Sequence, residues 1–300
     1  MQENRYPFCQ KQEIDRKRYG PLLMFAVFLL LYAALSAAVL LMAGAVCSLE
    51  KNGDLSEAAG FMIMSMHGTI FTKKYSTQWM IAMFGTNIAM MPSLELSHRA
   101  AFGKAPAKII SASGRWRWSV FARRLALSAA FFGSYMLLTA RDMQKIWACI
   151  PAKSMLLLIA MCLLQCLAEE MVFRGYALQT FSALSGSALF GILIQAFCFT
   201  IAHLYTTEMP ALVFITAFIW GILCCVTNGI EASFSMHLIF NLAHFVPDAA
   251  GYGMPADTGK AVYKYAACIA ASVIIAVLEA APKAMPRRQK GEEACLKSRY

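Results

Sequence analysis

The sequence is poor in charged residues, and in acidic residues above all. Only 15% of its 300 residues are charged, whereas 59% are hydrophobic. Soluble domains have about a quarter charged residues, so this composition excludes an ordinary water-soluble domain and indicates a membrane protein with several spans. The acidic residues number 17 against 27 Lys and Arg, a net charge of +10. Because most basic residues flank apolar runs, membrane topology explains them, and we expect no nucleic acid partner.

Several signatures of known catalytic sites are also missing. The chain has no Gly-x-Ser-x-Gly, which argues against a serine hydrolase elbow. It has no His-Glu-x-x-His, which argues against a zincin-type metalloprotease, and no Cys-x-x-Cys of the kind that builds zinc clusters. No internal repeat is visible, which counts against a transporter.

The apolar runs predict an all-α fold, a polytopic membrane helical bundle with about eight transmembrane helices. The expected spans are 21–47, 75–94, 125–140, 153–169, 187–205, 209–227, 231–247 and 262–281, with an interfacial or re-entrant piece at 58–71. The expected organisation is a cytoplasmic segment at 1–20, an N-terminal transmembrane region with a basic cytoplasmic loop at 21–149, a core at 150–250, and a last helix with a basic tail at 251–300.

The basic segments predict the orientation in the bilayer. Residues 95–124 carry seven Lys and Arg against a single acid, Glu95, and both ends of the chain are basic. Cytoplasmic loops carry such an excess, so we expect a multi-pass protein of the cell membrane with both termini in the cytoplasm. Lys73 and Lys74 fit this topology poorly.

Three charged residues come directly after the apolar run from Ser154 to Leu167. Glu169, Glu170 and Arg174 would cost about 2.5 to 3.5 kcal/mol each at membrane depth, which predicts a functional role. In a helix, Glu170 and Arg174 share a face and can form an ion pair that supports the local structure. Glu169 points about 100° away and is left free to exchange a proton.

Further polar residues follow on two later helices. His203 ends the fifth predicted span, and His237 and Asn241 lie four residues apart on one face of the seventh, with His244 a turn beyond. Small residues allow these helices to approach closely, namely Gly191, Gly221 and Ser233.

Two kinds of chemistry fit these side chains. Glu169 can take a proton from a water positioned by His203, while His237 and Asn241 donate to a developing oxyanion, which are the groups that amide hydrolysis needs. Alternatively, two His and one carboxylate can bind a divalent metal such as zinc. The residues alone do not choose between these two readings.

Three motifs in order carry a family resemblance. Glu169-Glu170-x-x-x-Arg174, Phe199-x-x-x-His203 and His237-x-x-x-Asn241 resemble the CPBP family of intramembrane metalloproteases, also called the Abi or CAAX prenyl protease family. The resemblance covers about residues 150–250. It implies an eight-helix intramembrane endopeptidase that acts on a peptide or membrane-anchored protein.

The resemblance also implies a role for each residue. Glu169 would be the general base acting with His203 on a water, and His237 with Asn241 would form the oxyanion site. Glu170 and Arg174 would be structural support, and a divalent metal would be a candidate cofactor. It assigns no role to His244.

Two other functions stay open from the sequence. One is a non-catalytic bacteriocin-immunity or membrane scaffold protein, which would keep its function after Glu169→Ala. The other is a transporter whose carboxylates carry protons, which substrate flux in liposomes would reveal.

Overall fold

The computed structural model describes residues 20–50, 77–106, 108–139, 149–203, 209–247, 249 and 258–280. Within these ranges every regular element is helical, and the predicted all-α membrane bundle is confirmed. Several sequence predictions lie outside the described residues: the basic segments at both ends, the interfacial piece at 58–71, Lys73 with Lys74, and the outer loop at 206–208.

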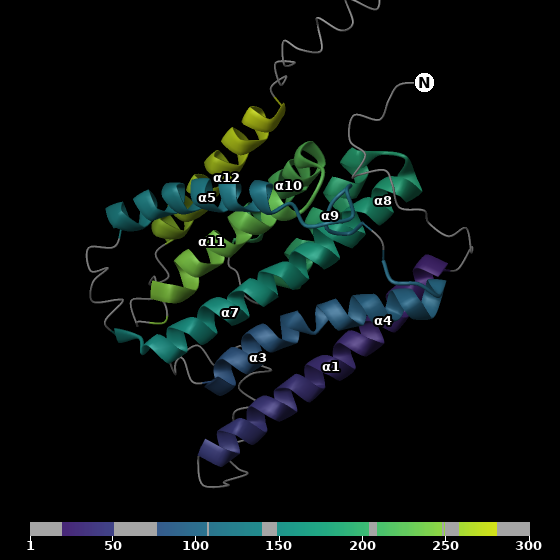
Figure 1. The fold of residues 1–300 in the computed structure, drawn as a ribbon, viewed down its shortest axis with the longest axis horizontal. Helices are drawn as coiled ribbons and strands as arrows, with labels where there is room; N and C mark the ends of the chain where they lie inside the picture. The colour runs from purple at the N-terminus through teal and green to yellow at the C-terminus, as the bar shows by residue number, and fades with distance from the viewer. Residues whose placement is uncertain are drawn as a thin grey trace, which may run out of the picture.

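Figure 1 shows the order of the helices along the chain. They are α1 (Gly20–Glu50), α3 (Thr77–Ile88), α4 (Met90–Phe102), α5 (Trp118–Thr139), α7 (Ala152–Glu169), the π-helix η3 (Glu170–Ala177), α8 (Leu178–Ser185), α9 (Ala188–His203), α10 (Pro210–Thr227), α11 (Glu231–Pro247) and α12 (Thr258–Ala280).

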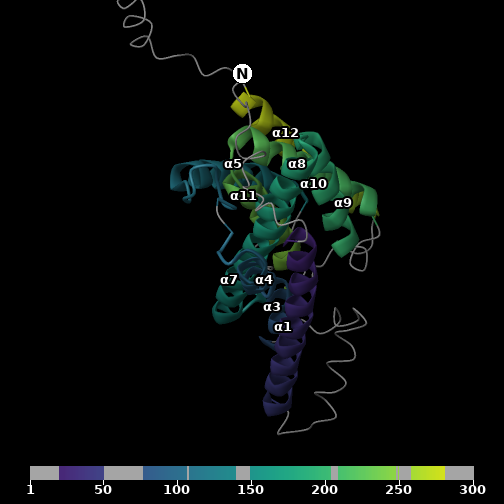
Figure 2. The ribbon, with the colours of Figure 1, turned by 90° about the vertical axis from the view of Figure 1, so that its right-hand side faces the viewer.

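Helix α7 occupies the middle of the bundle. On one side α7 packs against α3, and α3 packs against α1. On the other side α7 packs against α11, and α11 packs against α5 (Figure 1). Helices α9, α10 and α12 form a second row, with α10 between the other two. Figure 2, turned by 90°, shows α1 extending away from the rest of the bundle. Helix α7 contacts α11, and η3 at the end of α7 contacts α9, so the helices with the predicted site residues meet around α7 and η3.

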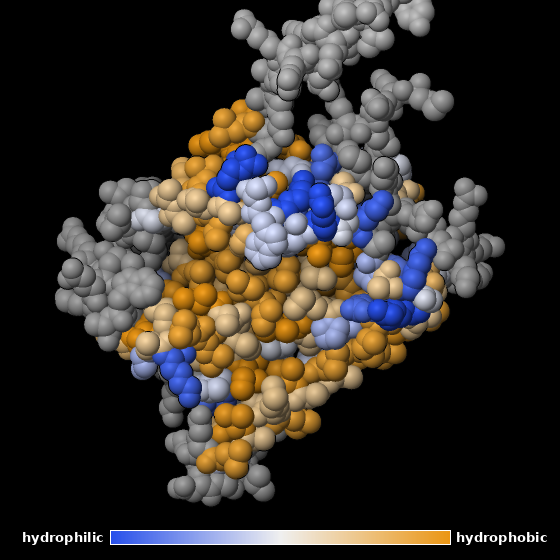
Figure 3. Space-filling model, viewed as in Figure 1, coloured by the Kyte–Doolittle hydropathy of each residue, from blue (hydrophilic) through white to orange (hydrophobic). Residues whose placement is uncertain are grey.

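The outer surface of α1 is apolar. Only 6% of its most hydrophobic window is buried, and Phe25, Leu30 and Leu41 are among its exposed side chains. In Figure 3 apolar residues dominate the middle of the face, whereas hydrophilic residues gather toward its margins. Such exposed apolar surface has a favourable partner in lipid acyl chains, so this surface fits a bilayer.

Among the described residues, three helical segments are long and apolar enough to cross a membrane, namely Leu23–Leu49, Ala152–Ser185 and Pro210–Thr227. Two shorter apolar helices lie at Ala188–His203 and Tyr265–Leu278. The remaining predicted spans are shorter or carry polar and charged residues, which lower their hydropathy. The eight-span count therefore stays a prediction.

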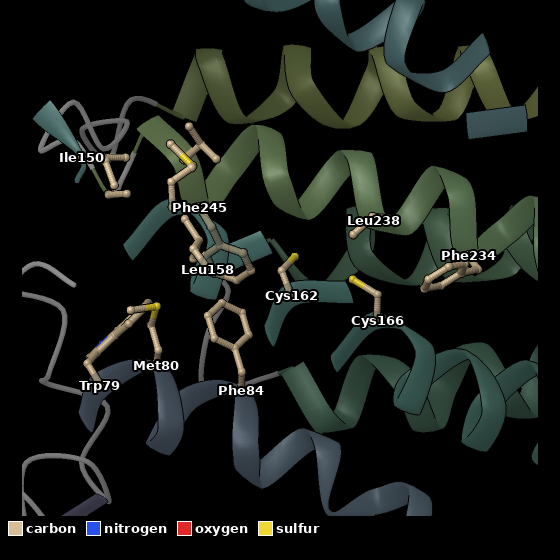
Figure 4. Close-up of a cluster of buried hydrophobic side chains, with 13 residues drawn as sticks. Trp79, Met80, Phe84, Ile150, Leu158, Cys162, Cys166, Phe234, Leu238 and Phe245 are labelled. Atoms are coloured by element: carbon tan, nitrogen blue, oxygen red, sulfur yellow. The ribbon is translucent and has the colours of Figure 1, made fainter. Parts of the chain in front are cut away.

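Aromatic and sulfur-containing side chains fill the space between α3, α7 and α11 (Figure 4). Phe84 of α3 is fully buried and meets Phe245 of α11 edge to face, with ring centroids 5.1 Å apart. Leu158 and Cys162 of α7 lie in the same cluster. These contacts fix α7 relative to α11, the helix that carries two of the predicted site residues.

Two predicted boundaries were wrong. The predicted span 75–94 is two helices, α3 and α4, and the second continues to Phe102. Pro92 has no N–H to offer the carbonyl of Ile88, which accounts for the break at Ala89. The predicted span 153–169 also does not end at Glu169, because the chain stays helical from α7 through η3 to the end of α8.

The segment between α4 and α5 lies against the start of α11. Ala112 N–H donates to the carbonyl of Asn228, and Ile230 N–H donates to the carbonyl of Ile110, at 3.0 and 2.9 Å. Gly175 of η3 also packs closely against this segment, since a Cβ there would lie only 2.5 Å from the carbonyl oxygen of Ile109. The basic loop thus contacts both η3 and α11.

An ion pair between Arg117 and the buried Glu231 holds this loop against α11. Arg117 donates through Nη2 to Glu231 Oε2, through Nε to Oε1 at 2.8 Å, and through Nη1 to the carbonyl oxygen of Thr227 at 2.7 Å. The Glu231 side chain is fully buried and that of Arg117 is 24% exposed. A bidentate pair of this kind constrains geometry as well as adding energy.

We therefore expect Glu231→Ala to lower the free energy of unfolding by about 3 kcal/mol, since it removes a buried carboxylate and leaves the partly buried Arg117 without its counter-charge. Thermal unfolding in detergent measures the effect. Glu95→Ala is the matched control, because its pair with Arg99 is more than half exposed on both sides and such pairs contribute little. Equal shifts in the two variants would contradict the structural role of the pair between Arg117 and Glu231.

Candidate functional site

The predicted acidic pair lies at the junction of α7 and η3. Glu169 is the last residue of α7 and Glu170 the first of η3, and both side chains are buried. π-Helical turns of this kind are rare and occur often at functional sites. The wider turn changes the directions of the side chains that follow, so this junction decides where each carboxylate points.

Glu170 and Arg174 form the ion pair expected from their spacing. Arg174 Nη1 lies 3.1 Å from Glu170 Oε1, and both side chains are fully buried. Two aromatic rings flank the guanidinium: its Cζ is 4.1 Å from the ring centroid of Phe199 and 5.3 Å from that of Trp220. None of the guanidinium nitrogens is aligned for a hydrogen bond to another described residue, so charge pairing and ring faces stabilise this cation.

Glu170 also holds α11 in place. Its Oε1 accepts from His237 Nδ1 at 2.9 Å, and its Oε2 accepts from the hydroxyl of Ser233. Sequence reasoning assigned Ser233 only to close helix packing, but its hydroxyl donates to the buried carboxylate. Because an ionised carboxylate only accepts, the His237 Nδ1 carries the proton of this bond.

Glu169 uses its two oxygens differently. Oε1 accepts from the Nε2 of Gln165, and Oε2 has no hydrogen-bond partner among the described residues. Oε2 faces two imidazoles, with His237 Nε2 at 3.5 Å and His203 Nε2 at 3.8 Å. These separations exceed a direct hydrogen bond. A water or a substrate group between the three atoms could bond to all of them.

The His203 ring is oriented by α9 itself. Its Nδ1 lies 2.8 Å from the carbonyl oxygen of Phe199, one turn earlier, and the two rings stack with centroids 4.2 Å apart. A carbonyl only accepts, so Nδ1 carries a proton and Nε2 of the neutral ring has a lone pair directed toward Glu169. The side chain of His203 is 28% exposed, which makes it the accessible edge of the site.

Asn241 reaches Glu169 through Gln165. Its Nδ2 donates to Gln165 Oε1 at 3.1 Å and lies 3.4 Å from Cys166 Sγ. The structure therefore brings Glu169, His203 and His237 into one direct cluster and joins Asn241 to it by one side chain. His244 is exposed, and its ring contacts Phe245 at 5.3 Å.

Sequence reasoning missed Gln165. This residue is 4% exposed and lies one helical turn before Glu169, so the two share a face of α7. A glutamine inside an otherwise apolar run was the signal that could have found it, because buried polar side chains in membrane helices need partners.

The donor set partly fits a metal. Each imidazole bonds a carbonyl or carboxylate through Nδ1, as metal-ligating histidines do. Among the described residues, however, no group of three or more His, Cys, Asp or Glu side chains is placed to hold a metal ion. The divalent cofactor therefore stays a prediction.

The comparisons with known proteins point to one family. Residues 151–243 match the family model Rce1-like, described as type II CAAX prenyl endopeptidase Rce1-like. This match confirms the resemblance to CPBP or CAAX proteases and supports a membrane protease of the CAAX type. No curated protein and no solved structure matches the chain.

We expect Arg174→Met to lower the free energy of unfolding by about 3 to 5 kcal/mol, because it leaves Glu170 as an unpaired buried charge. The double variant with Glu170→Gln should lose less, since it removes both charges and keeps an acceptor for His237. Thermal unfolding in detergent compares the two. Additive losses would show that the two charges do not interact.

Proposed function

We propose that this chain is a CAAX-type intramembrane endopeptidase in which Glu169 and His203 activate water and His237 and Asn241 stabilise the oxyanion. One observation carries the proposal. Glu169 Oε2 is a buried carboxylate oxygen that has no hydrogen-bond partner among the described residues and faces two imidazole nitrogens. A buried acceptor left in this way costs free energy, which a reactive water would recover.

In the first step, water lies between Glu169 Oε2 and His203 Nε2. The carboxylate takes one proton as the water oxygen attacks the scissile carbonyl carbon, and His203 accepts a hydrogen bond from the second O–H. The distance of 3.8 Å between the two protein atoms leaves the water within hydrogen-bond reach of both. A C–O bond forms and the carbonyl oxygen becomes an oxyanion.

His237 and Asn241 stabilise that oxyanion. The Nδ1–H of His237 already donates to Glu170, so donation from its Nε2 to the oxyanion requires a proton on both ring nitrogens. Asn241 Nδ2 has a second N–H beyond the one given to Gln165, and its other hydrogen-bond contact in the described part of the chain is the weak acceptor Cys166 Sγ. Fixed donors in a water-poor site contribute strongly to such steps.

The second step breaks the C–N bond. Glu169 returns its proton to the departing amide nitrogen, which leaves as an amine, while the carbonyl reforms as a carboxylic acid. The enzyme is restored with Glu169 ionised, so no other proton donor is required.

The substrate is a peptide or membrane-anchored protein that enters past His203 and Asn241, the partly exposed members of the site. His237 lies six residues after Glu231, about 9 Å along α11 from the pair with Arg117 on the basic loop. If that loop is cytoplasmic, as its charge predicts, the scissile bond is cut near the cytoplasmic face.

We expect Glu169→Gln to lower kcat about 100- to 10,000-fold, because an amide cannot accept the proton of water. His203→Ala should also lower kcat. The assay uses purified protein in detergent with a defined pool of synthetic peptides, some ending in a farnesylated CAAX sequence, and mass spectrometry of the products.

Glu95→Gln is the control for this assay, since it neutralises an exposed carboxylate of α4 and should cleave as the wild type does. Cleavage at equal rates by Glu169→Gln and the wild type would refute the assignment. Biological activity that survives Glu169→Gln would instead favour a scaffold or immunity function.

A further test addresses the metal. Because the mechanism uses water and protein groups only, we expect kcat to stay within about twofold after treatment with 1,10-phenanthroline and dialysis. Loss of cleavage that added Zn²⁺ restores would assign the two imidazoles and Glu169 to a metal instead.

A further inference from the structure

We infer that Gln165 is a positioning residue that sets the reactive geometry of both Glu169 and Asn241. It hydrogen-bonds both side chains: its Nε2 donates to Glu169 Oε1, and its Oε1 accepts from Asn241 Nδ2 at 3.1 Å. This inference rests on the proposed function and adds to it the group that aligns the base with the oxyanion site.

The first effect of Gln165 is on the carboxylate. The last torsion of a glutamate side chain is broad and roughly twofold, so its two oxygens can exchange positions. A donor on Oε1 holds the carboxylate in one orientation and leaves Oε2 facing the imidazoles of His203 and His237. Gln165 thereby determines which oxygen of Glu169 acts as the base.

The second effect is on the amide of Asn241, and it follows from charge. Ionised Glu169 can only accept, so Gln165 must turn its NH₂ group toward it. The carbonyl oxygen of Gln165 then faces Asn241, which must answer with its own NH₂ group. The remaining N–H of Asn241 is left for the oxyanion, since its present neighbour, Cys166 Sγ, is a weak acceptor.

The hydrogen-bond partners of Gln165 differ from those of a buried glutamine that only joins two helices. Gln195 on α9 provides the comparison, because it is also fully buried in the bundle. Its Nε2 donates to two backbone carbonyls, those of Ile192 and Ala217, and so joins α9 to α10. Gln165 instead bonds two side chains from different helices that the proposed reaction uses.

The test is Gln165→Met, which keeps the length of the side chain and removes both hydrogen bonds. We expect kcat to fall about 10- to 100-fold with KM within about twofold, because Gln165 acts through the base and the oxyanion donor and not on the peptide. Gln195→Met is the matched control and should keep the wild-type kcat per folded molecule. The probe is an internally quenched version of the peptide from the synthetic pool that the wild type cleaves fastest.

A double-mutant comparison separates positioning from a loss of fold. In an Asn241→Ala background, the Gln165→Met substitution should lower kcat by a smaller factor than in the wild type, because one of its two targets is already gone. Multiplicative effects, an unchanged kcat, or a rise in KM alone would overturn the inference. Gln165→Leu takes the place of Gln165→Met if the latter does not fold.

The two proposals fail in distinguishable ways. If the wild type cleaves no peptide faster than Glu169→Gln, the proposed function fails and this inference with it. If the wild type cleaves and Glu169→Gln does not, while Gln165→Met retains the wild-type kcat, only the positioning role fails.

Discussion

The structure of the site depends on one constraint, the need to stabilise ionised side chains in a helical bundle that fits a bilayer. Glu170 and Arg174 are both fully buried, and each would cost several kcal/mol alone. Their mutual pairing is only part of the solution. Glu170 also accepts from His237 and Ser233, and Arg174 lies against the rings of Phe199 and Trp220. The contacts of Glu170 and Arg174 therefore hold α9, α10 and α11 around η3.

This arrangement separates two carboxylates that are adjacent in sequence. Both oxygens of Glu170 accept hydrogen bonds, from His237 and Ser233. Glu169 accepts one from Gln165 through Oε1, and its Oε2 faces two imidazoles. His237 links the two environments, because its Nδ1 meets Glu170 and its Nε2 faces Glu169. A change at the structural pair should consequently alter the reactive side as well.

The basic loop provides a second anchor at the same end of α11. Arg117 binds Glu231, and the backbone of residues 110–112 bonds that of residues 228–230. Gly175 permits the close approach of η3 to this loop, since any side chain there would meet the carbonyl of Ile109. The loop that the sequence marks by its charge therefore also braces the two elements that carry His237 and Glu170.

The sequence was informative where local pattern decides structure. Apolar runs predicted the membrane bundle, and helical spacing predicted that Glu170 and Arg174 would face each other. Local pattern did not predict the break at Ala89 or the continuous helix through Glu169, although Pro92 was visible. It also missed Gln165 as a member of the site, because a single polar residue in an apolar run has no meaning until its neighbours are known.

By itself, then, the sequence determined the class of fold, the set of polar groups that the membrane must accommodate, and the family they resemble, because hydropathy and helical spacing are local properties. Only the tertiary structure decided which oxygen of Glu169 stays unpaired, which nitrogen of each imidazole faces it, and which side chain joins Asn241 to the base. Those outcomes depend on contacts between helices that are distant in the chain, and hydrogen-bond partners across such distances are set by packing.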